Sequence, residues 1–215
     1  MTKALKIDFV SDVVCPWCVI GLKSLEAAIA NASDVLTAEI TFQPFELNPD
    51  MAPEGENVAE HIARKYGADA TRSEGTRDLI RNSAAELGFT MATTRDSRIW
   101  NTFDCHRLLH WAALEGRQPQ LKMALFTAHF TDQKSLADPE VLVAAAVTAG
   151  LDGDAARQVL ATGAYIAEVR QEERHWREMD IHAVPAIIIN GKYLITGGQP
   201  VAAFEKVLRR IAAEG

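Results

Sequence analysis

Two cysteines near the start of the chain, separated by two residues, lie between a strand-like and a helix-like segment. Residues 5–10 largely alternate in polarity, as a half-buried strand does, and residues 22–29 repeat apolar side chains at helical spacing. Pro16 favours the first position of a helix, where the N–H that it lacks would be unpaired. We therefore predict that Cys15 caps the helix and that Cys18 is its third residue, which places a reactive motif at a strand-to-helix junction.

The position of this motif predicts redox chemistry. A helix N-terminus carries unpaired N–H groups and a partial positive charge, and both stabilise a thiolate. Cysteines in such places have pKa values of roughly 3.5–7.5, compared with about 8.5 for a free cysteine. We expect Cys15 to be the nucleophile that attacks a disulfide. Cys18 lies one turn later on the same helix face, so we expect it to be the resolving thiol.

A zinc-stabilised binding module is an alternative, because half of a zinc site has the same Cys-X-X-Cys spacing. The chain has one further cysteine, Cys105, and no second pair. Zinc would have to combine the pair with Cys105 and His106, whose side chains diverge on a helix. We therefore favour redox chemistry without a metal. We interpret Cys105 as a buried small residue, and His106 and His110 as a helix-packing or polar-face pair.

Composition narrows the classes of partner. The chain has 215 residues, of which 48% are hydrophobic and 24% charged, as in an ordinary globular protein. Its formal net charge of −7 argues against nucleic acid, which requires a basic face. No apolar run approaches the ~20 residues of a membrane span, and the first residues do not have the pattern of a secretory signal. We expect a cytoplasmic protein that binds neither membrane nor nucleic acid; its oligomeric state stays open, with a homodimer as one option.

The rest of the chain has strand patterns at both ends and helical patterns in the middle. A second strand is predicted at 36–45, helices from 57 to 179, two strands at 183–198 joined by Asn190-Gly191, and a closing helix from 200. This order, β–α–β, helical insertion, α–β–β–α, predicts an α/β fold with helices on both faces of a sheet. We divide the chain into a discontinuous α/β domain, residues 1–55 and 180–215, and a helical insertion, residues 56–179. The last helix of the insertion is expected to pack back on the α/β part.

This arrangement resembles a thioredoxin fold (a mixed central sheet flanked by helices) with a large all-helical insertion. The specific similarity is to DsbA-like oxidoreductases of the FrnE type, which are related to 2-hydroxychromene-2-carboxylate isomerases and kappa-class glutathione transferases. The matching segments are Ser11-Asp12-Val13-Val14-Cys15-Pro16-Trp17-Cys18, Phe42-Gln43-Pro44-Phe45-Glu46-Leu47-Asn48-Pro49, Asn101-Thr102, His106-Arg107-Leu108-Leu109-His110-Trp111-Ala112, Val184-Pro185 and Gly197-Gly198-Gln199-Pro200. Two departures are Cys105, where a small residue is usual, and Ala183, where a glycine is usual; the extra C-terminal cysteines of some relatives are also missing.

The resemblance implies a disulfide oxidoreductase or isomerase that acts on a protein or small-thiol substrate without an organic cofactor. It also implies that Pro185 is cis and faces the Cys15 sulfur, so that the backbone of Val184 binds an extended substrate. We add Pro16 and Trp17 as substrate-binding residues, with Trp17 exposed. The main alternative is a glutathione-dependent isomerase or transferase of small aromatic compounds, which keeps glutathione open as a co-substrate. Such enzymes typically have serine where Cys15 stands.

Two acidic residues near the motif also lead to predictions. Asp12 lies three residues before Cys15, and a nearby carboxylate disfavours a second negative charge. Pro16 and Trp17 offer no compensating cation. We therefore predict that the Cys15–Cys18 dithiol/disulfide couple is less oxidising than that of DsbA, whose reduction potential is about −120 mV. Its potential should approach that of thioredoxin, which is about −270 mV. Glu46 is interpreted as a solvated loop acid, and His182 as a residue that could line the cleft.

Overall fold

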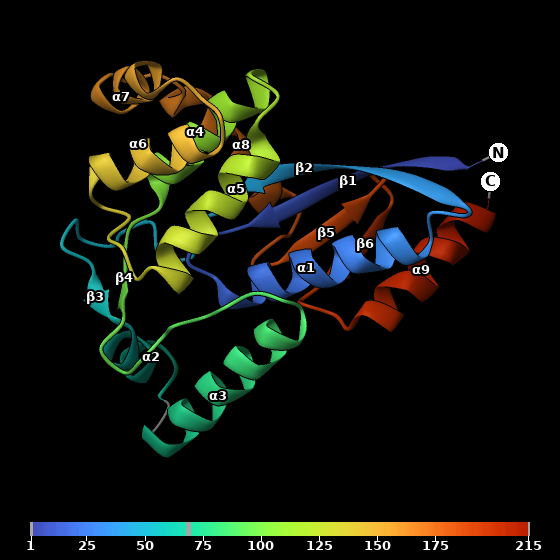
Figure 1. The fold of residues 1–215 in the computed structure, drawn as a ribbon, viewed down its shortest axis with the longest axis horizontal. Helices are drawn as coiled ribbons and strands as arrows, with labels where there is room; N and C mark the ends of the chain where they lie inside the picture. The colour runs from blue at the N-terminus through green and yellow to red at the C-terminus, as the bar shows by residue number, and fades with distance from the viewer. Residues whose placement is uncertain (1, 68–69, 215) are drawn as a thin grey trace.

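The computed structural model describes residues 2–67 and 70–214, and its centre is a four-stranded sheet with helices on both faces (Figure 1). The strands are β1 (Lys3–Ser11), β2 (Leu36–Pro44), β5 (Ala186–Ile189) and β6 (Tyr193–Thr196), in the order β2-β1-β5-β6. β1 pairs parallel with β2 and antiparallel with β5, and β5 pairs antiparallel with β6. The predicted α/β class and the order of its elements are confirmed.

The central strand β1 is covered on both faces, and its alternation separates two layers of the core. Leu5 and Phe9 belong to the main core together with the helix α1 (Pro16–Asn31). Val10 belongs instead to a second cluster with Trp176 of α8 (Ile166–Glu178). Successive side chains of a strand point to opposite faces, so α1 and α8 cover opposite faces of the sheet. The end of β1 that leads into the cysteine motif is therefore enclosed.

Local sequence signals account for the C-terminal half of the sheet. Asn190 and Gly191 have φ of 53° and 63°, the positive values that a type I′ turn requires at both central residues, and the Lys192 N–H closes the turn by donating to the carbonyl of Ile189 at 3.1 Å. The closing helix α9 (Val201–Ala213) begins after Pro200, as predicted, and lies beside α1 on one face of the sheet (Figure 1). This pairing of helices buries Leu25 of α1 and Phe204 of α9.

The middle of the chain is mainly helical, as expected. It contains α2 (Val58–Tyr66), α3 (Ala70–Glu86), α4 (Phe103–Leu114), α5 (Gln118–Phe126), the π-helical turn η1 (Thr127–Thr131), α6 (Pro139–Thr148), α7 (Gly153–Ala161) and α8. The expectation of helix almost throughout misses a two-stranded ladder, β3 (Glu56–Asn57) with β4 (Arg98–Ile99). Two residues per strand are too few to show a period in the sequence.

The insertion and the sheet share one hydrophobic core. Leu25 of α1, Leu108 of α4 and Leu125 of α5 are all fully buried in the same cluster. The division of the chain into two parts at residues 55/56 and 179/180 stays a prediction. Among the helices in the described ranges, none is long and apolar enough to cross a membrane.

Candidate active site

Cys15 occupies the N-cap of α1, and Pro16 is the first residue of that helix, as the sequence predicts. The Cys15 N–H donates to the carbonyl of Asp12 at 3.2 Å, and the Cys18 N–H donates to the carbonyl of Cys15 at 3.1 Å. Both cysteines are free thiols. Cys15 is 5% exposed and Cys18 is wholly buried, so Cys15 is the outer sulfur and Cys18 the inner one.

The outer sulfur faces the loop that precedes β5. The peptide bond between Val184 and Pro185 is cis, and the Sγ of Cys15 donates to the carbonyl of Val184 at 3.7 Å. The carbonyl of Pro185 is already used, because it accepts from the N–H of Gly197 at 2.8 Å. Val184 therefore lies beside Cys15, although it is 169 residues away in sequence.

The other two predicted substrate-binding residues border the same place. Pro16 and Trp17 are both half-buried. Trp17 is less exposed than expected because its ring and carbonyl lie close to Gly198, where an added Cβ would be 3.1 Å from the Trp17 carbonyl oxygen and 3.5 Å from its ring. Trp17 thus packs against the end of β6 and can offer a substrate only part of its ring.

The inner thiol is strongly held in its protonated form. Burial raises the pKa of Cys18 well above 9.0, and the neighbouring Cys15 raises it further, while the positive charge of Lys122 opposes the shift. Sequence reasoning missed Lys122, which lies on α5 in an apolar run and is wholly buried. A lysine within an apolar run was the available signal, but lysines on amphipathic helices are usually solvated.

Asp12 does not present its carboxylate to the thiols in the way that the sequence analysis assumed. Its Oδ2 accepts from the N–H of Leu47 at 2.7 Å, and its Oδ1 lies 3.6 Å from Nε2 of His106, with both side chains buried. Burial opposes ionisation, but His106 and the Leu47 amide outweigh it and lower the pKa of Asp12 below 3.8. Asp12 therefore anchors the loop after β2 beneath the motif.

The interpretation of Glu46 as a solvated acid is wrong. Its side chain is buried, and its Oε1 accepts from Nη1 of Arg170 at 2.8 Å, which also donates to Glu173 at 2.7 Å. Burial and the charge of Glu173 raise the pKa of Glu46 to about 7. The partner is 124 residues away, so no local pattern could show the burial. His182 is 71% exposed and pairs with Asp180 at 2.9 Å, and its place at the cleft stays a prediction.

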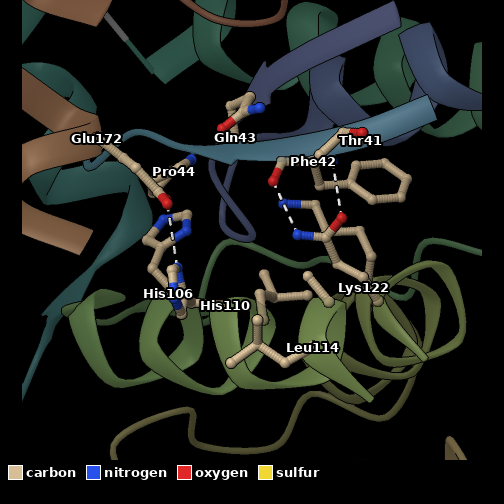
Figure 2. Close-up of a pocket in the computed structure, with 12 residues that line it drawn as sticks. Thr41, Phe42, Gln43, Pro44, His106, His110, Leu114, Lys122 and Glu172 are labelled. Carbon is tan, nitrogen blue, oxygen red and sulfur yellow. Dashed lines mark hydrogen bonds and ion pairs between the residues drawn. The ribbon is translucent and has the colours of Figure 1, made fainter. Parts of the chain in front are cut away.

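A cavity of about 130 Å³ opens between β2 and the helices α4 and α5 (Figure 2). Gln118 closes one wall by exchanging two hydrogen bonds of 2.9 Å with the backbone of Phe42. His110 pairs with Glu172 at 3.1 Å, and His106 and Lys122 also line the cavity. Neither Cys15 nor Cys18 lines this cavity.

The residues considered for zinc do not form a metal site. Across the described ranges, no group of three or more His, Cys, Asp or Glu is placed to hold a metal ion. Cys105 is wholly buried, as expected, and burial together with the charge of Asp12 raises its pKa far above 9.0. His106 faces Asp12 and His110 faces Glu172, so the two histidines act in separate pairs.

Comparisons with known proteins agree with this geometry. Residues 6–209 match the family described as DSBA-like thioredoxin domain. The chain is 30% identical over 209 residues to the protein YwbO of Bacillus subtilis (strain 168), covering 97% of this chain and 96% of that one. The crystal structure of probable DsbA oxidoreductase SCO1869 from Streptomyces coelicolor has a TM-score of 0.91 at 34% identity, covering 98% and 91%. A 2-hydroxychromene-2-carboxylate isomerase shares the fold, with a TM-score of 0.65 at 14% identity over 97% of each chain.

Proposed function

We propose that this chain, which belongs to the DSBA-like thioredoxin domain family, is a thiol–disulfide oxidoreductase that acts through Cys15 and Cys18. The observation that carries the proposal is the position of Cys15 at the N-cap of α1, with Cys18 one turn deeper. The helix N-terminus stabilises a thiolate on the outer sulfur, which is the form that attacks disulfides. Probable DsbA oxidoreductase is also the printed name of the structure at 34% identity.

The reaction needs no metal or organic cofactor. The Cys15 thiolate attacks one sulfur of a substrate disulfide, forms a mixed disulfide and releases the other substrate sulfur as a thiolate. Cys18 then loses its proton and attacks the sulfur of Cys15, which releases the second substrate thiolate. The net change is one disulfide reduced and the Cys15–Cys18 disulfide formed, and the reverse sequence oxidises a dithiol.

Val184 is the proposed substrate-binding residue. Its carbonyl accepts the Cys15 thiol in the reduced protein, at 3.7 Å. Cys15 has no proton to donate once it is ionised or in a mixed disulfide, so this carbonyl is then available to a backbone N–H of an extended substrate. The half-buried Pro16 and Trp17 border the same opening. A peptide or protein segment around a disulfide, or a small thiol such as glutathione, fits this recognition.

The test uses the chromogenic disulfide 5,5′-dithiobis(2-nitrobenzoate) with the reduced protein. We expect the wild type to release two equivalents of thionitrobenzoate, one from each step. Cys18→Ser should release one equivalent and remain as a mixed disulfide of Cys15 that mass spectrometry identifies. Cys15→Ser should lose the fast first release. Equal rates for Cys15→Ser and wild type would overturn the proposal.

The same Cys18→Ser variant separates the glutathione-dependent isomerase alternative from disulfide exchange. An isomerase needs one nucleophilic position and would keep its turnover of a small aromatic substrate with glutathione. A disulfide-exchange enzyme needs the second thiol, so its Cys18→Ser variant would lose multiple turnover of a disulfide peptide. We expect loss of exchange turnover and no glutathione-dependent isomerisation in either protein.

A further inference from the structure

A second cavity, of about 320 Å³, lies between residues 92–100 and residues 129–134, which include the end of η1. Two hydrogen bonds join these segments. The Ala92 N–H donates to the carbonyl of Phe130 at 2.8 Å, and Oγ1 of Thr131 donates to the carbonyl of Thr90 at 2.6 Å. Neither cysteine of the motif lines this cavity. Pockets for small molecules measure roughly 300–1,000 Å³, so the cavity can hold a ligand without involving the thiols.

His129 presents an unpaired polar edge to this cavity. It lies on the π-helical turn η1, and such turns are frequent at functional sites. The residue is 6% exposed, yet it lines the cavity. Its ring contacts Phe130 edge-on, with centroids 4.5 Å apart, but neither ring nitrogen has a hydrogen-bond partner within the described ranges. Buried polar groups are nearly always hydrogen-bonded, so we expect the partner of this ring in the cavity.

The His129 ring is neutral and offers one donor. Burial lowers its pKa to about 4, and the charge of Asp12 opposes this shift only in part. A neutral imidazole carries one N–H donor and one acceptor nitrogen. A carboxylate beside the ring would accept from the N–H, and its charge would favour the imidazolium form.

Two cationic side chains, Arg98 of β4 and Lys134, line the same cavity. Nη2 of Arg98 donates to the carbonyls of Glu54 at 2.7 Å and Gly55 at 3.0 Å, and the guanidinium lies 5.4 Å from the ring centroid of Trp100. These contacts hold the guanidinium in place. Its Nε and Nη1 have no partner among the residues that the structure describes, so they are free to donate to a ligand.

Two acidic side chains lie near these cations, and both are exposed. Asp96 lines the cavity, and Asp132 pairs with Lys134 at 3.3 Å. Exposed charges interact weakly because water and salt screen them, whereas His129 is buried and Arg98 is held in place. The donors therefore favour a negative ligand, and Asp96 limits how tightly that ligand binds.

We propose that this cavity binds a small organic carboxylate. One carboxylate oxygen accepts from the ring N–H of His129, and the other accepts from the free N–H groups of Arg98. The apolar part of the ligand lies against the half-buried ring of Trp100. Binding is non-covalent and does not depend on the chemistry of Cys15 and Cys18.

The test is an NMR titration of the full chain with butyrate, and with butyramide as the uncharged molecule of the same shape. We expect butyrate to shift the His129 ring signals and to raise the pKa of His129 above 4, because a negative charge arrives beside a buried imidazole. Butyramide should do neither. Equal responses to the two molecules, or none to butyrate, would show a hydrated groove without preference for an anion and would overturn the inference.

Substitutions at the cavity should change the affinity for butyrate in opposite directions. His129→Phe keeps a planar ring without nitrogen and should weaken binding at least tenfold, since it removes a hydrogen bond to a charged group. Asp96→Asn removes the exposed negative charge and should tighten binding roughly two- to fivefold. Asp154→Asn, at an exposed acid of α7, is the matched control and should leave the affinity unchanged. If His129→Phe does not fold, equal affinities of Asp96→Asn and Asp154→Asn would still contradict the inference.

The carboxylate could belong to a free acid or to the disulfide substrate itself, and kinetics distinguish the two. The disulfide 5,5′-dithiobis(2-nitrobenzoate) carries two carboxylates, whereas 2,2′-dithiodipyridine carries none. Butyrate that slows the reaction of Cys15 with the first compound alone would assign the carboxylate to the substrate. Unchanged rates with both compounds would assign it to a free acid, which we expect because neither cysteine lines the cavity. Loss of the Cys15 reaction itself would overturn the proposed function and leave this site intact.

Discussion

Gly21 of α1 packs directly against the ring of Pro185, so that a Cβ atom added to Gly21 would lie 3.1 Å from Cγ of that ring. The same atom would lie 3.3 Å from Cα of Gly198. Pro185 follows Val184, whose carbonyl accepts the Cys15 thiol. The close approach of helix and sheet at Gly21 therefore sets how far the nucleophile lies from the segment proposed to bind substrate.

Gly21→Ala should force α1 away from the loop at Pro185. We expect a loss of roughly 1–3 kcal/mol in the free energy of unfolding, as for other overpacked sites. We also expect slower attack by Cys15 on a disulfide peptide, because the substrate segment shifts relative to the sulfur. Urea denaturation and single-turnover kinetics measure the two effects.

Gly75→Ala is the matched control, since Gly75 lies within α3 with no atom near the position of an added Cβ. Alanine in an open helix position should stabilise the chain by roughly 0.5–1 kcal/mol. If Gly21→Ala behaved like Gly75→Ala in both stability and rate, the close packing would not matter to the site.

Glu46 should make the stability of the fold depend on pH. Its pKa is about 7 in the folded chain and 4.5 in the reference state, so between these values the folded protein holds a proton that the unfolded chain has lost. Stability from this group is complete below about pH 4.5 and decreases as the pH rises to about 7. Glu46→Gln still accepts a hydrogen bond from Arg170 and should remove this slope, which urea unfolding at several pH values measures.

Glu54→Gln is the control variant, because Glu54 is an exposed acid in the same segment between β2 and β3 as Glu46. This variant should keep the wild-type slope between pH 4.5 and 7. Parallel pH profiles for the wild type and Glu46→Gln would show that Glu46 does not titrate in this window.

Arg107 should be essential to the helical insertion. Its buried guanidinium donates to the carbonyls of Val159, Thr162 and Ala164 and to the carboxylate of Asp104. Arg107→Lys cannot reach all of these acceptors and leaves buried carbonyls without donors, at a cost of about 2–4 kcal/mol. Guanidinium denaturation should show this loss, and Arg157→Lys at an exposed ion pair should show no measurable change. Equal stability of the two variants would contradict the role of Arg107.

Local patterns in the sequence predict most of this fold and the chemical pair at its centre. Pro16 after Cys15 indicates the helix start, and Asn190-Gly191 indicates the hairpin, because each depends on backbone preferences of adjacent residues. The cis bond before Pro185 and its place beside Cys15 came instead from the resemblance to a family. Local sequence patterns do not show that Cys15 and Val184, which are 169 residues apart, lie side by side.

The electrostatic surroundings of the site could not be predicted from local sequence. Lys122 has the pattern of an ordinary helical lysine, and tertiary packing around α5, which contacts β2, α4 and α6, leaves it wholly buried. Glu46 lies in a turn-rich stretch that suggests solvent, but Arg170 of α8 covers it from another part of the chain. Burial and charge pairing of this kind depend on tertiary contacts, which a period of apolar residues does not specify.

Alkylation of the reduced protein by iodoacetamide, followed by mass spectrometry at each cysteine, tests the central claim most directly. At pH 6 we expect Cys15 to react at least tenfold faster than an unstructured peptide thiol, because the N-terminus of α1 stabilises its thiolate. Cys18 and Cys105, both wholly buried, should react only after unfolding. A Cys15 rate at pH 6 equal to that of the peptide thiol would contradict the account of this chain as a disulfide-exchange enzyme.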